Sequence, residues 1–171
     1  LLQFGLLILV GMMAGVINTL AGGGSLLTLP VLIFMGLPPN VANATNRIGI
    51  AFQALIGTVG YRSKGVSNFP FNIYLGISAL MGSLIGAQIA VDIKGETFNK
   101  VLAVIMIIVV AIVVFKPKVS SLKFPERLTG RYLFYAVFGF FFIGIYGGFI
   151  NAGIGFVIIL FLNNVNRLSL I

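Results

Sequence analysis

Apolar stretches alternate with short polar or glycine-rich segments along the chain, and this alternation predicts a set of membrane helices. Five of the stretches approach about 20 residues, the length that an α-helix needs to cross the hydrocarbon core; they are Leu1–Leu20, Val41–Tyr61, Asn72–Val91, Phe98–Phe115 and Tyr132–Asn151. Two more, Leu26–Leu37 and Phe156–Leu162, are too short to cross. We therefore expect an all-α, polytopic transmembrane protein whose short stretches belong to broken or re-entrant helices.

Glycines interrupt the chain after the first and after the last long stretch. The breaks read AGGGS at residues 21–25 and AGIG at residues 152–155, and both follow similar residues, AGVIN at 14–18 and GGFIN at 147–151. Because glycine disfavours a helix, each run predicts a helix break. The chain thus holds one full repeat and the opening of another, and broken helices at matching places in two repeats are typical of secondary transporters.

The basic residues predict how these segments cross the membrane. The loop Lys116–Arg131 holds five basic residues and one acidic residue, and short basic loops stay in the cytoplasm. With this loop and Arg62–Lys64 inside, the first stretch enters from outside and the second repeat from inside, so the repeats are inverted and their breaks meet near mid-membrane. The predicted divisions are residues 1–115 (first repeat), 116–131 (basic loop) and 132–171 (start of a second, incomplete repeat).

The composition excludes a soluble domain and several kinds of chemistry. Hydrophobic residues make up 59% and charged residues 8% of the chain, whereas soluble proteins carry about 25% charged residues. We expect an integral protein of the plasma or inner membrane, or of an organellar inner membrane, in contact with the lipid bilayer. The net charge of +8 lies in gaps between apolar stretches, which favours membrane topology over nucleic-acid binding. With no Cys, no His and no acidic residue inside a crossing stretch, we expect no metal, no cofactor and no acid–base enzyme.

The segment around the first break carries a resemblance to a known family. The segment reads AGVINTLAGGGSLLTLP at residues 14–30, then GLPP at 36–39 and ANATN at 42–46, and YGGFINAGIGF at 146–156 is its counterpart in the second half. This pattern resembles the TauE/SafE family of membrane anion exporters, which implies sulfite, sulfoacetate or a related small organosulfur anion as substrate. The family has a complete second repeat. Since this sequence stops where the counterpart of residues 40–115 would begin, we expect a truncated second repeat.

The glycine breaks are the first candidates for contact with the anion. Gly22, Gly23, Gly24 and Ser25 lead into a short helix, and free N–H groups at a helix start attract anions. Gly153 and Gly155 repeat this pattern. Close packing of helices without a ligand is the alternative. Packing is also what we expect of the small-residue pairs Gly11/Gly15, Gly82/Gly86 and Gly144/Gly148.

Polar side chains near the breaks are the second group of candidates. Asn18 and Asn151 precede the breaks at equivalent positions, and each amide could donate to a sulfite or sulfonate oxygen or could cap the broken backbone of its own repeat. Arg47 could attract the anion or could extend its side chain to the membrane interface. The residues that begin the third stretch are predicted to flank the site; they are Asn43, Thr45, Asn46 and Arg47.

These observations lead to one functional hypothesis and one alternative. The hypothesis is a membrane transporter that exports a small sulfite- or sulfonate-like anion from a site between two inverted repeats, as a single chain or within an oligomer or larger complex. The alternative is a non-transporting structural subunit of a larger membrane complex.

Overall fold

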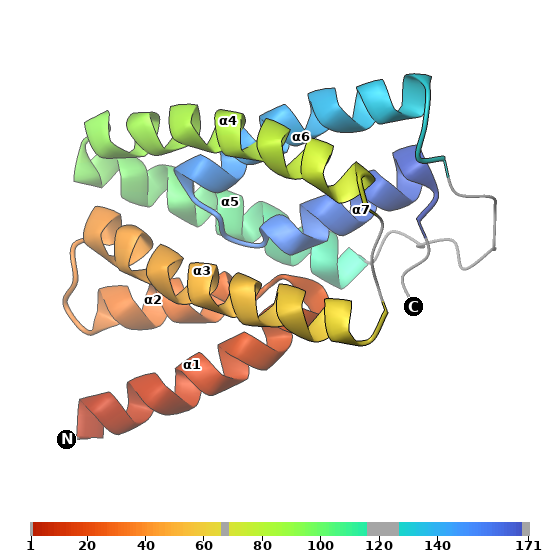
Figure 1. The fold of residues 1–171 in the computed structure, drawn as a ribbon. Helices are drawn as coiled ribbons and strands as arrows, with labels where there is room; N and C mark the ends of the chain where they lie inside the picture. The colour runs from red at the N-terminus through yellow and green to blue at the C-terminus, as the bar shows by residue number, and fades with distance from the viewer. Residues whose placement is uncertain (1, 66–68, 116–126, 169–171) are drawn as a thin grey trace.

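The computed structural model describes residues 2–65, 69–115 and 127–168, which form a bundle of helices (Figure 1). The part of the chain that it describes contains no strand, so the predicted all-α class is confirmed. Most of the predicted basic loop, residues 116–126, lies outside the described residues. The helices are α1 (Leu2–Ala21), α2 (Ser25–Phe34), α3 (Pro39–Ser63), α4 (Phe71–Asp92), α5 (Gly95–Phe115), α6 (Arg131–Phe149) and α7 (Ile154–Asn166).

The two broken elements are pairs of a long and a short helix that turn back on themselves in opposite directions. In Figure 1, α1 starts at the left-hand end of the bundle and α2 returns to that end, whereas α6 starts at the right-hand end and α7 returns to it. The ends of α2 and α4 lie at the left, and those of α3 and α5 at the right. This is the inverted arrangement that the sequence predicts.

Among the described helices, α4 and α6 make the most extensive contact, and glycines make their close approach possible. A Cβ atom on Gly82 or Gly86 would overlap the α6 backbone at Phe141 or Ile145, and a Cβ atom on Gly144 or Gly148 would overlap the α4 backbone. The expectation that these two pairs are packing contacts is confirmed. For Gly11 and Gly15 it is wrong within the described chain, because a Cβ atom on either would meet no neighbour.

The second break lies inside the protein core. Ile150 and Ala152 are fully buried in a cluster with Leu29 of α2 and Phe98 of α5. Unwound backbone at membrane depth requires such burial, since lipid offers no hydrogen bonds. The second break is therefore shielded from lipid, as a broken helix inside a bilayer must be.

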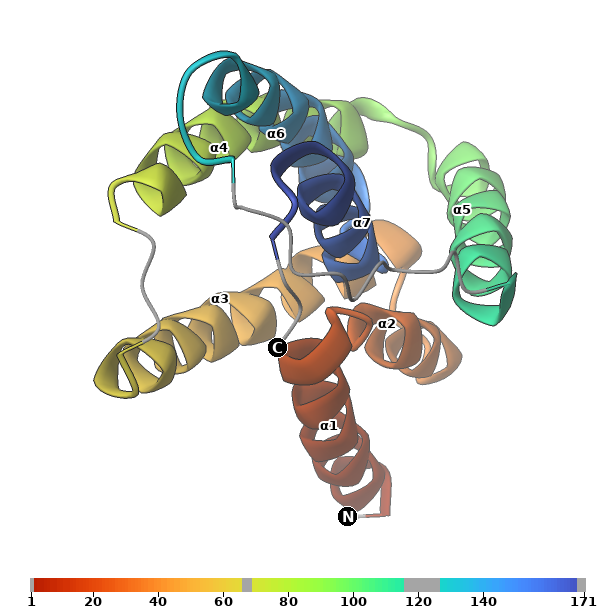
Figure 2. The same ribbon diagram turned by 90° about the vertical axis from the view of Figure 1, so that its right-hand side faces the viewer.

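The outer surface of the bundle is apolar. Large side chains such as Phe34 (88% exposed) and Leu20 (77% exposed) point outward, and α4 and α6 are each long and apolar enough to cross a membrane. Figure 2 shows α1 projecting away from the other helices, and its first half, with Phe4 and Ile8, is exposed. Such a surface fits hydrocarbon and not water.

Candidate functional site

The two glycine breaks meet in space. Gly22 and Gly153 both have a φ of 68°, a left-handed conformation that glycine adopts at no steric cost. The backbone N–H of Gly155 donates to the carbonyl oxygen of Gly22 at 3.2 Å, and a Cβ atom on either glycine would overlap the other residue. At Gly22 and Gly155, therefore, the glycines serve close packing, which the sequence left as the alternative to a ligand site.

The breaks differ slightly from the predicted ones. The first comprises Gly22–Gly24, and Ser25 already begins α2. The second runs from Ile150 to Gly153, two residues earlier than expected, so Gly155 is helical. The predicted equivalence of Asn18 and Asn151 is wrong for the same reason, because Asn18 lies in the last turns of α1 whereas Asn151 lies in the break, with a φ of 61°.

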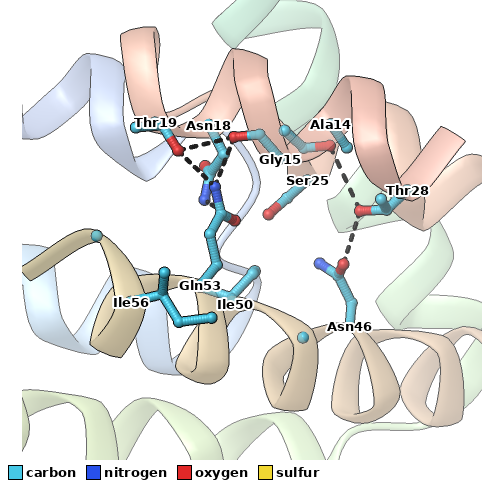
Figure 3. A pocket seen from close by; sticks show the side chains of 14 residues that line it. Ala14, Gly15, Asn18, Thr19, Ser25, Thr28, Asn46, Ile50, Gln53 and Ile56 are labelled. Carbon is cyan, nitrogen blue, oxygen red and sulfur yellow. Dashed lines mark hydrogen bonds between the residues drawn. The ribbon is translucent and has the colours of Figure 1, made fainter. Parts of the chain in front are cut away.

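A cavity of about 520 Å³ opens between the first break and α3 (Figure 3). Four of the predicted site residues line it: Asn18, Gly24, Ser25 and Asn46. The other lining residues were missed by the sequence analysis; they are Gly11, Ala14, Gly15, Thr19, Thr28, Gly49, Ile50, Gln53, Ile56 and Gly57. No lining residue carries a charge, so the cavity offers dipoles and hydrogen bonds instead.

The cavity wall contains a buried hydrogen-bond donor that has no partner among the described residues. Ser25 is 3% exposed and begins α2, whose N-terminus has no side-chain cap in the described structure. Asn46 is 8% exposed; its Oδ1 accepts from the Thr28 hydroxyl at 2.6 Å, whereas its Nδ2 has no partner among the described residues. In Figure 3 both side chains point into the space between α3 and the break. A buried donor without a partner is costly, and a bound acceptor would remove that cost.

Gln53 closes one side of the cavity. Its Nε2 donates to the carbonyl oxygen of Gly15 at 2.6 Å and to Thr19 Oγ1 at 3.0 Å, and its Oε1 accepts from Asn18 Nδ2 at 2.9 Å. Beyond this network lies a second cavity of about 280 Å³, which reaches Tyr61 near the end of α3. The Asn18–Gln53 pair thus separates two consecutive cavities along α3.

Arg47 and Asn43 face away from the cavity, toward the second break. The Arg47 guanidinium donates to the carbonyl oxygens of Gly148 and Phe149, the latter at 3.1 Å, and Asn43 Nδ2 donates to that of Phe149 at 2.9 Å. These carbonyls end α6, where a helix carries partial negative charge. The structure therefore gives Arg47 a third role besides the two considered from the sequence, that of capping the broken helix of the other repeat.

The remaining predicted residues lie outside the cavity. Thr45 is exposed, Asn151 is half-buried, Gly23 packs against Phe156, and Gly153 packs against Val109 of α5. Asn43 Oδ1 is buried and has no partner among the described residues.

The inverted broken helices, their direct contact and the apolar outer surface define a polytopic integral membrane protein. The chain belongs to the TauE/SafE family, because the family described as sulfite exporter TauE/SafE matches residues 7–171.

Relatives with similar sequences are named as probable membrane transporter proteins. The chain is 30% identical over 150 residues, 88% of its length, to a "probable membrane transporter protein" of Haemophilus influenzae. It is 29% identical over 157 residues, 90% of its length, to the "probable membrane transporter protein YfcA" of Escherichia coli K12. The matches cover 58% and 56% of those proteins, so the chain spans about half the length of the relatives it matches. No solved structure matches it.

Proposed function

We propose that this chain supplies one side of a transport site for a small oxyanion, bound in the cavity between the first glycine break and α3. The observation that carries the proposal is that the start of α2 at Ser25, which has no side-chain cap in the described structure, and the unpartnered Nδ2 of Asn46 line the same cavity. A helix N-terminus attracts negative charge, and half-helix starts contact anionic substrates in transporters with inverted repeats.

The neutral lining favours passage over permanent binding. An anion in this cavity meets hydroxyl, amide and backbone dipoles but no Lys or Arg. Dipoles replace part of the hydration shell and release the ion more readily than an ion pair would, as conduction requires. Membership of the family described as sulfite exporter TauE/SafE supports sulfite or a small sulfonate as the anion and export as the direction. The positive charge of the loop 116–131 supports its placement in the cytoplasm.

The proposal is tested with the full-length protein in liposomes loaded with labelled sulfite or a small sulfonate. Asn46→Leu removes the free donor and keeps the branched shape of the side chain. Loss of one hydrogen bond to a charged group costs about 1.5–3 kcal/mol, so we expect efflux to fall about tenfold or more. Thr45→Val is the matched control, because Thr45 is the exposed neighbour on the same turn, and it should leave efflux unchanged.

The outcomes separate the two functional classes. Equal efflux by the parent and Asn46→Leu would remove the cavity from the transport path. A folded parent protein that moves none of these anions would favour the structural subunit instead.

A further inference from the structure

Three arginines gather where α6 begins and α7 ends, far along the chain from the cavity residues. Arg131 is the first residue of α6, Arg127 lies four residues before it, and Arg167 follows the last residue of α7. Both Arg127 Nη1 and Arg131 Nη2 donate to the hydroxyl oxygen of Tyr132, at 2.6 and 3.3 Å. The two guanidiniums also lie over the Tyr132 ring, at 4.4 and 5.1 Å from its centroid.

Asn166 fixes the position of Arg127 through two hydrogen bonds to its main chain. It is fully buried, its Nδ2 donates to the carbonyl oxygen of Arg127 at 2.8 Å, and its own carbonyl oxygen accepts from the Arg127 N–H at 2.9 Å. The main chain of Arg127 is thus held at both polar atoms to the end of α7. The same contact brings Arg167, the next residue, to this corner, where it adds to the positive potential at the Tyr132 phenol.

The hydrogen bonds to Tyr132 do not neutralise the charges of Arg127 and Arg131. The hydrogen-bond acceptor that Arg127 and Arg131 share is a neutral phenol, and the ion pair between described residues, Lys100 with Glu96, lies elsewhere. Two guanidiniums on one neutral oxygen repel each other. A group with several anionic oxygens would relieve this repulsion and suit the planar donor forks of arginine.

An apolar stripe runs from this cluster along α6. Phe134, Tyr135, Phe138 and Phe142 follow Arg131 at helical spacing, and each is more than half exposed. The rings of Phe134 and Phe138 stack with centroids 6.3 Å apart. Charge at a helix end, joined to an exposed aromatic stripe on a membrane-crossing helix, matches the headgroup and the acyl chains of a lipid.

We propose that Arg127 and Arg131 bind the phosphate of an anionic phospholipid, whose acyl chains lie along the aromatic stripe of α6. Anionic lipids populate the cytoplasmic leaflet, and basic pockets at the ends of membrane helices bind their headgroups. The proposal is independent of what the cavity transports.

The test compares lipids retained by the full-length protein after extraction from bilayers of equal phosphatidylglycerol and phosphatidylcholine, measured by native mass spectrometry. The double variant Arg127→Gln/Arg131→Gln removes two guanidiniums, each contributing about fivefold in affinity near a membrane surface. We expect its preference for phosphatidylglycerol to fall about 25-fold. The matched control is Arg62→Gln/Lys64→Gln, which removes the same charge from the exposed end of α3; because attraction to surface charge without a binding site does not hold a lipid through extraction, its preference should stay within about twofold of the parent.

Further measurements distinguish a bound lipid from other possible ligands of the cluster. Equal retention by the parent and the cluster double variant overturns the proposal, as does displacement of the lipid by inorganic phosphate, which would indicate a soluble anion. Glu126 precedes Arg127 and lies outside the described residues; an increase in retention above about fivefold in Glu126→Gln would make that carboxylate the occupant instead. Arg131→Gln alone, at an exposed position, should lose about fivefold and serves where the double variant does not fold.

Discussion

The backbone N–H of Gly155 donates to the carbonyl oxygen of Gly22 across 3.2 Å, so the two helix breaks are joined to each other and not merely placed at similar depth. This contact ties the first broken element to the second. At the start of α3, Ala42 and Asn43 are buried, and Arg47, one turn further along, caps the end of α6. The start of α3 and the two breaks therefore form one junction.

The junction should not tolerate a methyl group. Gly155→Ala places a Cβ atom against the Gly22 backbone, and overpacking of this kind costs about 1–3 kcal/mol. We expect a lower melting temperature in detergent. The control is Gly76→Ala on α4, where a Cβ atom meets nothing and a helix gains slightly from alanine; equal melting temperatures for the two variants would contradict the contact.

A larger side chain on α4 should destabilise the protein only on the face of α4 that packs against α6. Gly82→Leu forces a side chain into the α6 backbone at Phe141, whereas Gly76→Leu, six residues earlier on the same helix, extends into open space. We expect the first to abolish stable expression or to lower the melting temperature sharply and the second to have little effect. Two variants that behave alike would show that this glycine pair does not hold the helices together.

Arg47 should act through stability. Arg47→Gln removes a charged donor from the Phe149 carbonyl oxygen, at a cost of about 1.5–3 kcal/mol, and Arg47→Lys keeps the charge but loses the planar fork. We expect melting temperature and transport to fall together, more for Gln than for Lys. A loss of transport at unchanged melting temperature that grows at low salt would instead assign Arg47 to the attraction of the anion.

Gln53 should control passage between the two cavities. Gln53→Ala removes all three hydrogen bonds that link α3 to α1 at this point. A thiol placed by Ser25→Cys should then react faster with a reagent added from the side of Tyr61. Thr58→Ala is the control, since Thr58 lines the outer cavity but, among the described residues, its hydroxyl bonds within its own helix, to Ala54; a similar acceleration in that variant would argue against a constriction at Gln53.

Much of the fold follows from local sequence physics. Consecutive glycines disfavour a helix wherever they stand, and the breaks at Gly22–Gly24 and near Gly153 were predicted for that reason. The spacing of Gly82 with Gly86 and of Gly144 with Gly148 predicts a close helix contact. It does not say which helix is the partner, and only the structure pairs these two motifs with each other.

Only part of the site was predicted. The prediction grouped residues that are consecutive in the sequence, whereas side chains that share one face of a helix lie three or four residues apart. Asn46 lies next to Arg47 in sequence, yet neighbours on a helix point about 100° apart, so Asn46 faces the cavity while Arg47 and Asn43, four residues apart, face α6. The missed signal was present: Asn46, Ile50, Gln53 and Gly57 repeat at intervals of three and four on α3. The same spacing on α1 marks Gly11, Gly15 and Asn18 as cavity residues and not as a packing pair.

Protection of a thiol at the start of α2 tests the central claim, that an anion binds at the first break, most directly. The 171 residues contain no cysteine, and Ser25→Cys places a thiol of nearly equal size at the cavity wall. With the full-length protein freed of any other cysteine, the rate of alkylation by iodoacetamide is measured with and without a small sulfonate, and Thr45→Cys is the exposed control. The account predicts that the sulfonate slows alkylation at position 25 in a saturable way and leaves position 45 unchanged, and chloride at equal ionic strength should protect neither. Equal alkylation rates at position 25 with and without the sulfonate would contradict it.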